Sequence, residues 1–272
     1  MARPVTRDAA WVEREYNREK WPAVDRAVEQ ISSSERQPRL DRVLGRVARL
    51  QWSDADLTED REHVFGGQGA GVPTVVAFGG QSALVREFVL SECTSTTDLV
   101  VELGAGWAWH LLSIWVHGGP ATATYVAAEY TDAGRSAASR LAALDPTLDF
   151  RAVPFDYNEP ALSGLPDARH AVVFTQHSVE QIPQVPPALF EAVRALADQV
   201  TCIHFEPVGW QAGDQSRAGS SQDYANEHDY NRNLLSALRD EEAADRLRLD
   251  VVRTEVVGVN PRNATSVVLW RA

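Results

Sequence analysis

The segment from Asp98 to Gly106, with the sequence DLVVELGAG, constrains the fold of this chain more than any other feature. An apolar run ends at Glu102, two glycines separated by one residue follow, and a helical pattern comes next. This order is typical of a buried strand, a tight turn and a helix. Gly104 and Gly106 allow the backbone to turn sharply and to approach a ligand closely. Because Glu102 repels phosphate and attracts ammonium or hydroxyl groups, the turn favours a nucleoside that carries an amino acid over a pyrophosphate.

The composition narrows the class of protein. The chain has 272 residues, 44% hydrophobic and 24% charged, which allows one large core and a smaller extension. The net charge of −12 argues against sequence-independent nucleic-acid binding, which needs a basic surface. No apolar run suits a bilayer span or a signal peptide, and Cys93 and Cys202 give neither a disulfide framework nor metal-ligand spacing. We therefore expect a cytoplasmic protein with no metal and with no membrane or nucleic-acid partner.

The first part of the chain, residues 1–80, is predicted to be a packed helical extension or lid. Apolar stripes at helical spacing support this prediction: Val24, Val28 and Ile31, then Leu40, Val43, Leu44, Val47 and Leu50. Ser53 is a candidate cap of a further helix over residues 54–63. The glycine-rich residues 66–73 are predicted to be a loop, and a helix is expected from about residue 81 to residue 92.

From residue 98 onward the pattern alternates between strands and helices. Strands are predicted at residues 99–103, 122–129, 148–155, 170–175 and 200–205, with helices at 132–144 and 187–199. A polar helical segment over 220–246 leads to two further runs, 248–257 and 265–270, that are spaced to form an antiparallel hairpin. The expected class is α/β, with a doubly wound, mostly parallel sheet of seven strands and a ligand site beyond the carboxyl ends of the strands.

Three acids fall at corresponding places in this pattern. Glu102 ends the first predicted strand, Glu129 ends the second, and Asp156 follows the third. A carboxylate at the end of the second strand can accept hydrogen bonds from both hydroxyls of a ribose. Asp156 can accept from the exocyclic amino group of a purine, and Phe155 beside it could flank the ring.

With these motifs the sequence resembles the class I S-adenosylmethionine-dependent methyltransferases. Their glycine-rich motif is similar to Val101–Gly106, their acidic second-strand motif to Glu129, their adenine-contacting acid to Asp156, and their fourth-strand motif to Val172–His177. The resemblance covers residues 81–272, a predicted cofactor-binding domain, and implies a final strand antiparallel to the others. It implies S-adenosyl-L-methionine as cofactor, held by Glu102, Gly104, Ala105, Gly106, Glu129, Tyr130, Phe155, Asp156 and Gln176.

The loop after the fourth predicted strand is where such a fold places the transferred methyl group. His177 is the predicted base and Glu180 the predicted holder of a cation or amine. The alternative is that His177 bonds to the backbone of the turn and that Glu180 caps a helix. Predicted acceptor-binding residues are Glu206, Tyr230 and Tyr16, with Trp21 as an alternative to Tyr16. A pair formed by Glu180 and Glu206 would suit an amine or guanidinium.

The resulting function is methyl transfer to an oxygen or nitrogen of a small molecule, such as an amine or guanidine. One alternative is an NAD-dependent oxidoreductase, which is opposed by Glu102 and by Trp109 at the last glycine position of the dinucleotide fingerprint. Another is a non-catalytic module that binds S-adenosylmethionine. The sequence leaves the acceptor and the oligomeric state open, with a homodimer as one option.

Overall fold

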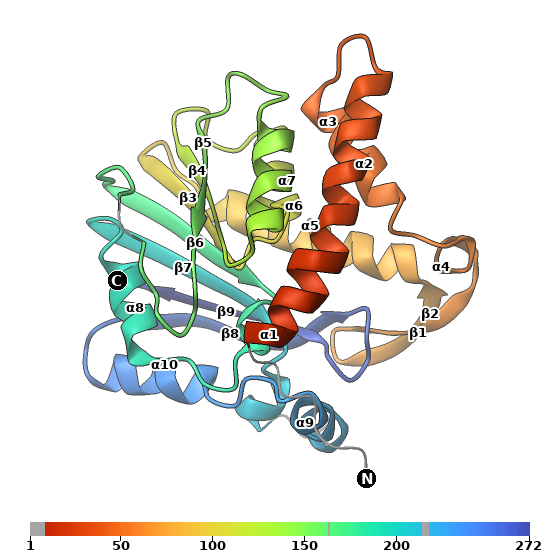
Figure 1. The fold of residues 1–272 in the computed structure, drawn as a ribbon. Helices are drawn as coiled ribbons and strands as arrows, with labels where there is room; N and C mark the ends of the chain where they lie inside the picture. Colours follow the sequence, from red (N-terminus) through yellow and green to blue (C-terminus); the bar gives the residue numbers. More distant parts are fainter. Residues whose placement is uncertain (1–8, 163, 214–217) are drawn as a thin grey trace.

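The computed structural model describes residues 9–162, 164–213 and 218–272, and within them the strands form one mixed sheet (Figure 1). The sheet has nine strands, where the sequence pattern predicted seven. In spatial order they are β2 (Gln68–Pro73), β1 (Asp60–Phe65), β8 (Arg248–Gly258), β9 (Thr265–Arg271), β7 (Gln199–Glu206), β6 (His170–Gln176), β3 (Thr97–Leu103), β4 (Thr124–Glu129) and β5 (Phe150–Pro154).

The centre of the sheet is parallel and its C-terminal part is antiparallel. β3 pairs in parallel with β4 and β6, and the outer pairs β4–β5 and β6–β7 are also parallel. β9 lies between β7 and β8 and runs antiparallel to both, so the predicted terminal hairpin is confirmed. Strands β3, β4 and β6 are almost wholly buried, which explains their continuous apolar runs. The α/β class is therefore as predicted.

Helices cover both faces of the sheet (Figure 1). Alternate strand residues point to opposite layers: Val100 and Val172 pack into one core cluster, Leu99 and Val173 into the other. On the first face lie α2 (Trp21–Ser34), α3 (Leu40–Arg49), α5 (Thr74–Glu92), α6 (Trp109–Val116) and α7 (Asp132–Ala142). On the second face lie α8 (Pro187–Arg194) and α10 (Leu234–Ala243).

The helical N-terminal segment is packed against this body. The two apolar stripes are buried on α2 and α3, in the same cluster as α6 and α7, except for Leu50, which follows the end of α3 and is 66% exposed. Ahead of α2 come α1 (Ala9–Val12) and a π-helical stretch, η1 (Glu13–Lys20), and Figure 1 shows them continuing the line of α2 across the carboxyl ends of the central strands. Residues 1–8 of the predicted extension lie outside the described residues.

Residues 54–80 differ from the prediction. The helix capped by Ser53 is only α4 (Asp54–Thr58), and residues 60–73 form the β1–β2 hairpin instead of a helix end and a loop. Gly66 and Gly67 both have positive φ, as a two-residue hairpin turn requires. The hairpin joins the sheet because β1 pairs antiparallel with β8. α5 begins at Thr74 and runs through the predicted boundary at residue 80, because its packing overrides the low helix propensity of Gly79 and Gly80.

Three shorter elements complete the described chain: η2 (Val179–Gln181), η3 (Gly209–Ala212) and α9 (Ala218–Glu227). Over the described ranges, no helix is long and apolar enough to cross a membrane.

A buried ion-pair cluster fixes α10 to α8. Glu241 of α10 is only 4% exposed and accepts hydrogen bonds from Arg194 on α8, at 2.6 Å, and from Arg246, at 2.7 and 2.8 Å. The Arg246 hydrogen bonds, with those from Arg194, lower the pKa of Glu241 to about 2, although burial opposes this shift.

We expect Glu241→Gln to lower the free energy of unfolding at pH 7 by ~2 kcal/mol, because it removes the charge from two charge-assisted contacts. Because the pKa of Glu241 is lower in the folded than in the unfolded protein, its carboxylate stabilises the fold above pH 4.5. This stabilisation is lost as the pH falls towards 2. Urea unfolding at several pH values should therefore show the gap between the two proteins closing on acidification. Asp240→Asn, an exposed change of the same charge on the same helix, is the control; an equal effect from it would contradict the assignment.

Candidate active site

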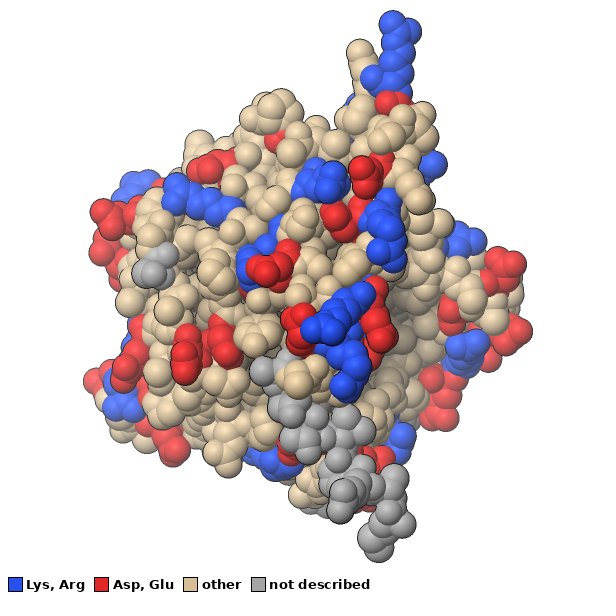
Figure 2. All heavy atoms as spheres, in the orientation of Figure 1, with Lys and Arg blue, Asp and Glu red and all other residues tan. Residues whose placement is uncertain are grey.

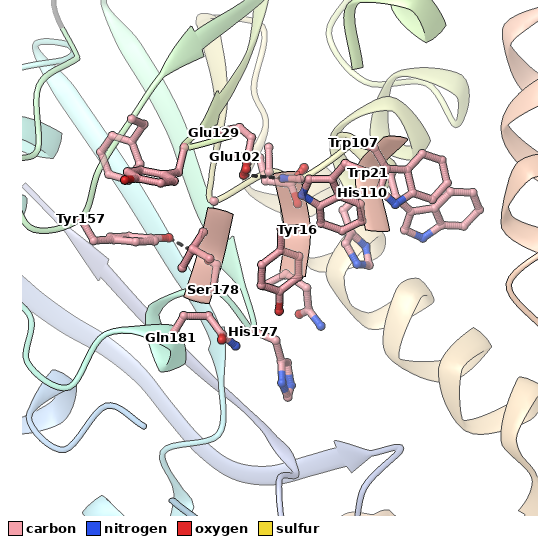
Figure 3. Close-up of a pocket in the computed structure, with 18 of the residues that line it drawn as sticks. Tyr16, Trp21, Glu102, Trp107, His110, Glu129, Tyr157, His177, Ser178 and Gln181 are labelled. Carbon is pink, nitrogen blue, oxygen red and sulfur yellow. Dashed lines mark hydrogen bonds between the residues drawn. The ribbon is translucent and has the colours of Figure 1, made fainter. Parts of the chain in front are cut away.

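A cavity of about 370 Å³ lies at the carboxyl ends of β3, β4 and β6 and is covered by η1 and the start of α2 (Figure 3). Its volume falls within the range of ~300–1,000 Å³ typical of small-molecule sites. Its position is the one expected for a ligand in an open α/β sheet, because the chain leaves β3 towards β4 on one side and later returns to β6 on the other side of β3.

The glycine turn after β3 forms one wall of the cavity. Gly104 and Gly106 have φ values of +69° and +54°, which side chains rarely adopt. A Cβ on Gly104 would lie 2.4 Å from the Cβ of Ser178, and a Cβ on Gly106 would lie 2.8 Å from the indole of Trp21. The amides of Gly104 and Ala105 donate to the carbonyl of Ala128 on β4, which fixes the turn to the sheet. Both glycines are therefore required by space as well as by conformation.

A hydroxyl cluster holds the turn from the other side. The hydroxyls of Tyr157 and Ser178 lie 2.7 Å apart, and each lies 2.9 Å from the carbonyl oxygen of Leu103 (Figure 3). The loops after β5 and β6 thereby meet at the end of β3. Neither residue was among the predicted site residues, although Tyr157 directly follows Asp156 and Ser178 directly follows His177.

Glu129 braces the glycine turn. Its carboxylate accepts from the amide of Gly106 at 2.9 Å and from the amide and hydroxyl of Thr131 at 2.9 and 2.6 Å. The Thr131 hydroxyl in turn caps α7 by accepting from the amide of Gly134. A carboxylate offers about four acceptor positions, so one remains for a ligand hydroxyl.

Glu102 of β3 holds the start of α6 in a similar way. Its Oε2 accepts from the amide of Leu111 in the first turn of the helix, at 3.1 Å, and its side chain is 3% exposed. Burial, with the Glu129 carboxylate nearby, raises the pKa of Glu102 well above its usual range, although the Leu111 amide opposes the shift. Glu102 and Glu129 lie together beside the turn (Figure 3), so the site concentrates carboxyl groups.

The other predicted cofactor residues, Tyr130, Phe155, Asp156 and Gln176, also line the cavity. Asp156 accepts through Oδ1 from the amide and side chain of Asn158. Gln176 has a buried Oε1 with no hydrogen-bond partner among the described residues, so it is available to a donor group of a ligand.

The charge of the cavity wall is one-sided. Glu102, Glu129 and Asp156 line it, whereas the wall residues that the structure describes include no lysine or arginine. A pyrophosphate would meet three carboxylates and no basic side chain. A ligand with cationic and hydroxyl groups would meet acceptors.

His177 lines the cavity, yet both of its ring nitrogens have protein partners. Nδ1 lies 3.0 Å from Oε2 of Glu180, and Nε2 lies 2.8 Å from the hydroxyl of Thr265, which also accepts from Gln81. Burial opposes protonation of this histidine, but the Glu180 and Glu206 carboxylates outweigh it and raise the pKa of His177 above its ordinary value. Glu180 is buried behind His177, where Asn263 donates to it, and does not line the cavity.

Glu206 also lies outside the cavity wall. Its carboxylate accepts from the amides of Ser178, Val179 and Glu180 at 3.1 to 3.2 Å, and so holds the first turn of η2. Burial, together with the Glu180 carboxylate, raises the pKa of Glu206 to about 7, against the opposing effect of His177. The two carboxylates predicted to grip an amine therefore do not converge on the cavity.

The remaining predicted acceptor residues do not all line the cavity. Tyr230 is buried next to Tyr224 and His228, away from the cavity, whereas Tyr16 of η1 and Trp21 of α2 are in its wall. The sequence analysis did not single out Trp52, Phe78 or His110, which also line it. The one local signal was the run Trp107-Ala-Trp-His110 after the glycine turn; Trp52 and Phe78 carry no motif and reach the site only through the packing of α3 and α5.

No protein-family model and no curated protein sequence matches this chain. Among solved structures, similarity was found to the magnesium protoporphyrin IX methyltransferase of Synechocystis PCC 6803 with bound SAH (12% identity, TM-score 0.46, 72% of this chain and 83% of that one). Similarity was also found to the plantazolicin methyltransferase BpumL in complex with a triazolic desmethylPZN analog and SAH (10% identity, TM-score 0.46, 93% of this chain and 98% of that one). A third similar structure is a SAM-dependent methyltransferase from Aquifex aeolicus (16% identity, TM-score 0.41, 74% of this chain and 98% of that one). At these values the function has to be argued from the residues of this chain.

We expect Gly104→Ala to destabilise the protein by ~2–4 kcal/mol, because it adds overlap with Ser178 to the strain of a positive φ. Gly66→Ala is the matched control, since Gly66 also has a positive φ but has nothing within 4 Å of the added carbon. Its expected cost is the strain alone, ~1–2 kcal/mol. Equal losses in urea unfolding would show that the contact with Ser178 contributes nothing.

Proposed function

We propose that this protein is an S-adenosylmethionine-dependent methyltransferase that acts on an oxygen or nitrogen of a small molecule. The observation that carries the proposal is the cavity beside the glycine turn, where buried Glu102 and Glu129 and the nearby Asp156 meet no lysine or arginine among the described wall residues. The donor carries an ammonium and a sulfonium cation, a ribose diol and an adenine amino group, each of which a carboxylate can receive.

The residues divide this task by position. Glu129, at the end of β4, is assigned to the ribose, and Asp156, after β5, to the adenine amino group, with Phe155 beside the ring. Glu102 and the unpartnered Oε1 of Gln176 are assigned to the ammonium end. When bound, the donor supplies an activated methyl group for in-line displacement. The contribution of the chain is to hold donor and acceptor in that line and to exclude water.

The size of the cavity supports a small acceptor. η1 and α2 cover the site, and a volume of about 370 Å³ leaves little room for a polymer in addition to the donor. An NAD-dependent oxidoreductase is disfavoured, because the pyrophosphate would lie against Glu102 and Glu129. A non-catalytic module predicts donor binding without transfer to any acceptor. The His177–Glu180 pair is proposed to hold the loop after β6, since both ring nitrogens are already engaged.

We expect Glu129→Gln to weaken binding of S-adenosylhomocysteine by about 10- to 100-fold, because charge-assisted hydrogen bonds are lost while the shape is kept. Calorimetric titration measures this, and the thermal midpoint of the free variant checks its folding. Exposed Glu87→Gln should bind like the wild type. Binding of NAD in place of S-adenosylhomocysteine would refute the proposal.

Affinity for S-adenosylhomocysteine should rise with pH through the elevated pKa of Glu102. Burial raises the pKa of this carboxyl in the free protein, whereas the ligand ammonium favours the ionised form, so binding releases a proton wherever the free carboxyl is protonated. Titrations in buffers of different ionisation enthalpy count that proton. Glu102→Gln should bind more weakly and lose this part of the pH dependence; an unchanged pH profile would assign the ammonium to another residue.

A further inference from the structure

The part of the cavity away from the carboxylates has an aromatic wall. We call Tyr16, Trp52, Phe78, Trp107 and Trp109 the aromatic subsite; all of them line the cavity. Trp52 and Phe78 meet edge to face with ring centroids 4.7 Å apart, and Trp107 and Trp109 are tilted at 5.6 Å. In Figure 3, Trp107 lies across the cavity from Tyr157. Rings gathered from the N-terminal segment, α5 and the glycine turn form a surface suited to a flat apolar group.

The aromatic subsite contributes no charged side chain to the cavity wall, and the Lys20 ammonium, 4.7 Å from the centre of the Tyr16 ring, is not among the wall residues. No carboxylate, lysine or arginine belongs to the aromatic subsite, and the acids that could have gripped an amine are engaged elsewhere. Glu180 is paired with His177, and Glu206 holds three backbone amides. A protonated amine would therefore meet no carboxylate in the aromatic subsite, while an uncharged ring would bury apolar area against several aromatic side chains.

His110 supplies the polar group of this end. It occupies the second position of α6, its side chain is in the cavity wall, and it has no hydrogen-bond partner among the residues that the structure describes. Burial, with a smaller effect of His177, lowers the pKa of His110 to about 3, so the imidazole is neutral at pH 7. A neutral imidazole offers one donor and one acceptor.

We infer that the acceptor is a flat, uncharged aromatic molecule that lies in the aromatic subsite and hydrogen-bonds to His110 through the oxygen or nitrogen that is methylated. This inference rests on the proposed function and deepens it, because it names the acceptor class. It replaces the amine or guanidine that the sequence favoured. His110, and not His177, is then the histidine that contacts the acceptor.

Three probes test the class by their shape and charge: 2-naphthol (flat, uncharged), 2-decalol (saturated, same hydroxyl) and 2-naphthylmethylammonium (flat, cationic). Quenching of tryptophan fluorescence and calorimetry measure binding with and without S-adenosylhomocysteine. We expect 2-naphthol to bind at least about tenfold more tightly than either other probe. 2-Decalol cannot stack on the rings, and 2-naphthylmethylammonium has to be desolvated as an ion. Equal or tighter binding of 2-decalol or of the cation would overturn the inference.

Two variants locate the site. Trp52→Leu should weaken binding of 2-naphthol by about tenfold, whereas Trp210→Leu, which removes a half-buried tryptophan outside this cavity, should leave it unchanged. His110→Phe keeps a ring and removes the hydrogen bond, so the preference of the wild type for 2-naphthol over 2-methylnaphthalene should disappear. A preference that persists in His110→Phe would show that His110 does not hold the hydroxyl.

The same titrations separate this inference from the proposed function. If S-adenosylhomocysteine does not bind but 2-naphthol shows the expected dependence on Trp52 and His110, the proposed donor is wrong and the aromatic subsite stands. If S-adenosylhomocysteine binds to all variants but 2-naphthol shows no dependence on either residue, the acceptor class is wrong and the donor stands.

Discussion

Three buried glutamates at the carboxyl ends of strands hold the loops that form the site. Glu102, Glu129 and Glu206 end β3, β4 and β7, and each accepts hydrogen bonds from amides at the start of a turn or helix. These amides would otherwise be unsatisfied in a buried place, where an unmade hydrogen bond costs ~1–3 kcal/mol. Two of them, Glu102 and Glu129, also line the cavity. Stability of the loops and the acidic character of the cavity wall therefore depend on shared groups.

The N-terminal segment completes the site by closing it. Asn17 of η1 accepts from the amide of Ala133 at the start of α7, and Asp25 of α2 pairs with Arg140 farther along the same helix. These contacts lay η1 and α2 over the glycine turn, where Trp21 lies against Gly106 and Tyr16 stacks on Trp21 at 5.4 Å. Around this docking region, basic and acidic side chains alternate on the outer surface (Figure 2), which keeps the cover polar outside and aromatic inside.

The sequence pattern indicated the glycine turn and the acids of the cavity wall, because these signals are local. The glycine pair, the acids at or just after the ends of β3, β4 and β5, and Gln176 at the end of β6 stand at fixed distances from strand ends, and all of them line the cavity. Sequence reasoning misjudged residues 60–73, since a glycine-rich strand at a sheet edge has no apolar alternation to identify it. It also assigned Glu180 and Glu206 to the acceptor, because a strand-end position does not specify whether a side chain meets a ligand or the backbone of its own loop.

The α/β sheet, the turn after β3 and the excess of acid beside it follow from the amino-acid sequence, because strand periodicity, glycine conformation and charge are properties of short segments. Which side chains share the cavity depends instead on how the helices and strands pack together. Trp52, Phe78 and His110 come together from distant parts of the chain through the packing of α3, α5 and α6. His177 and Glu206 are held by Thr265, Glu180 and three amides, contacts that exist only once β6, β7 and β9 are assembled side by side.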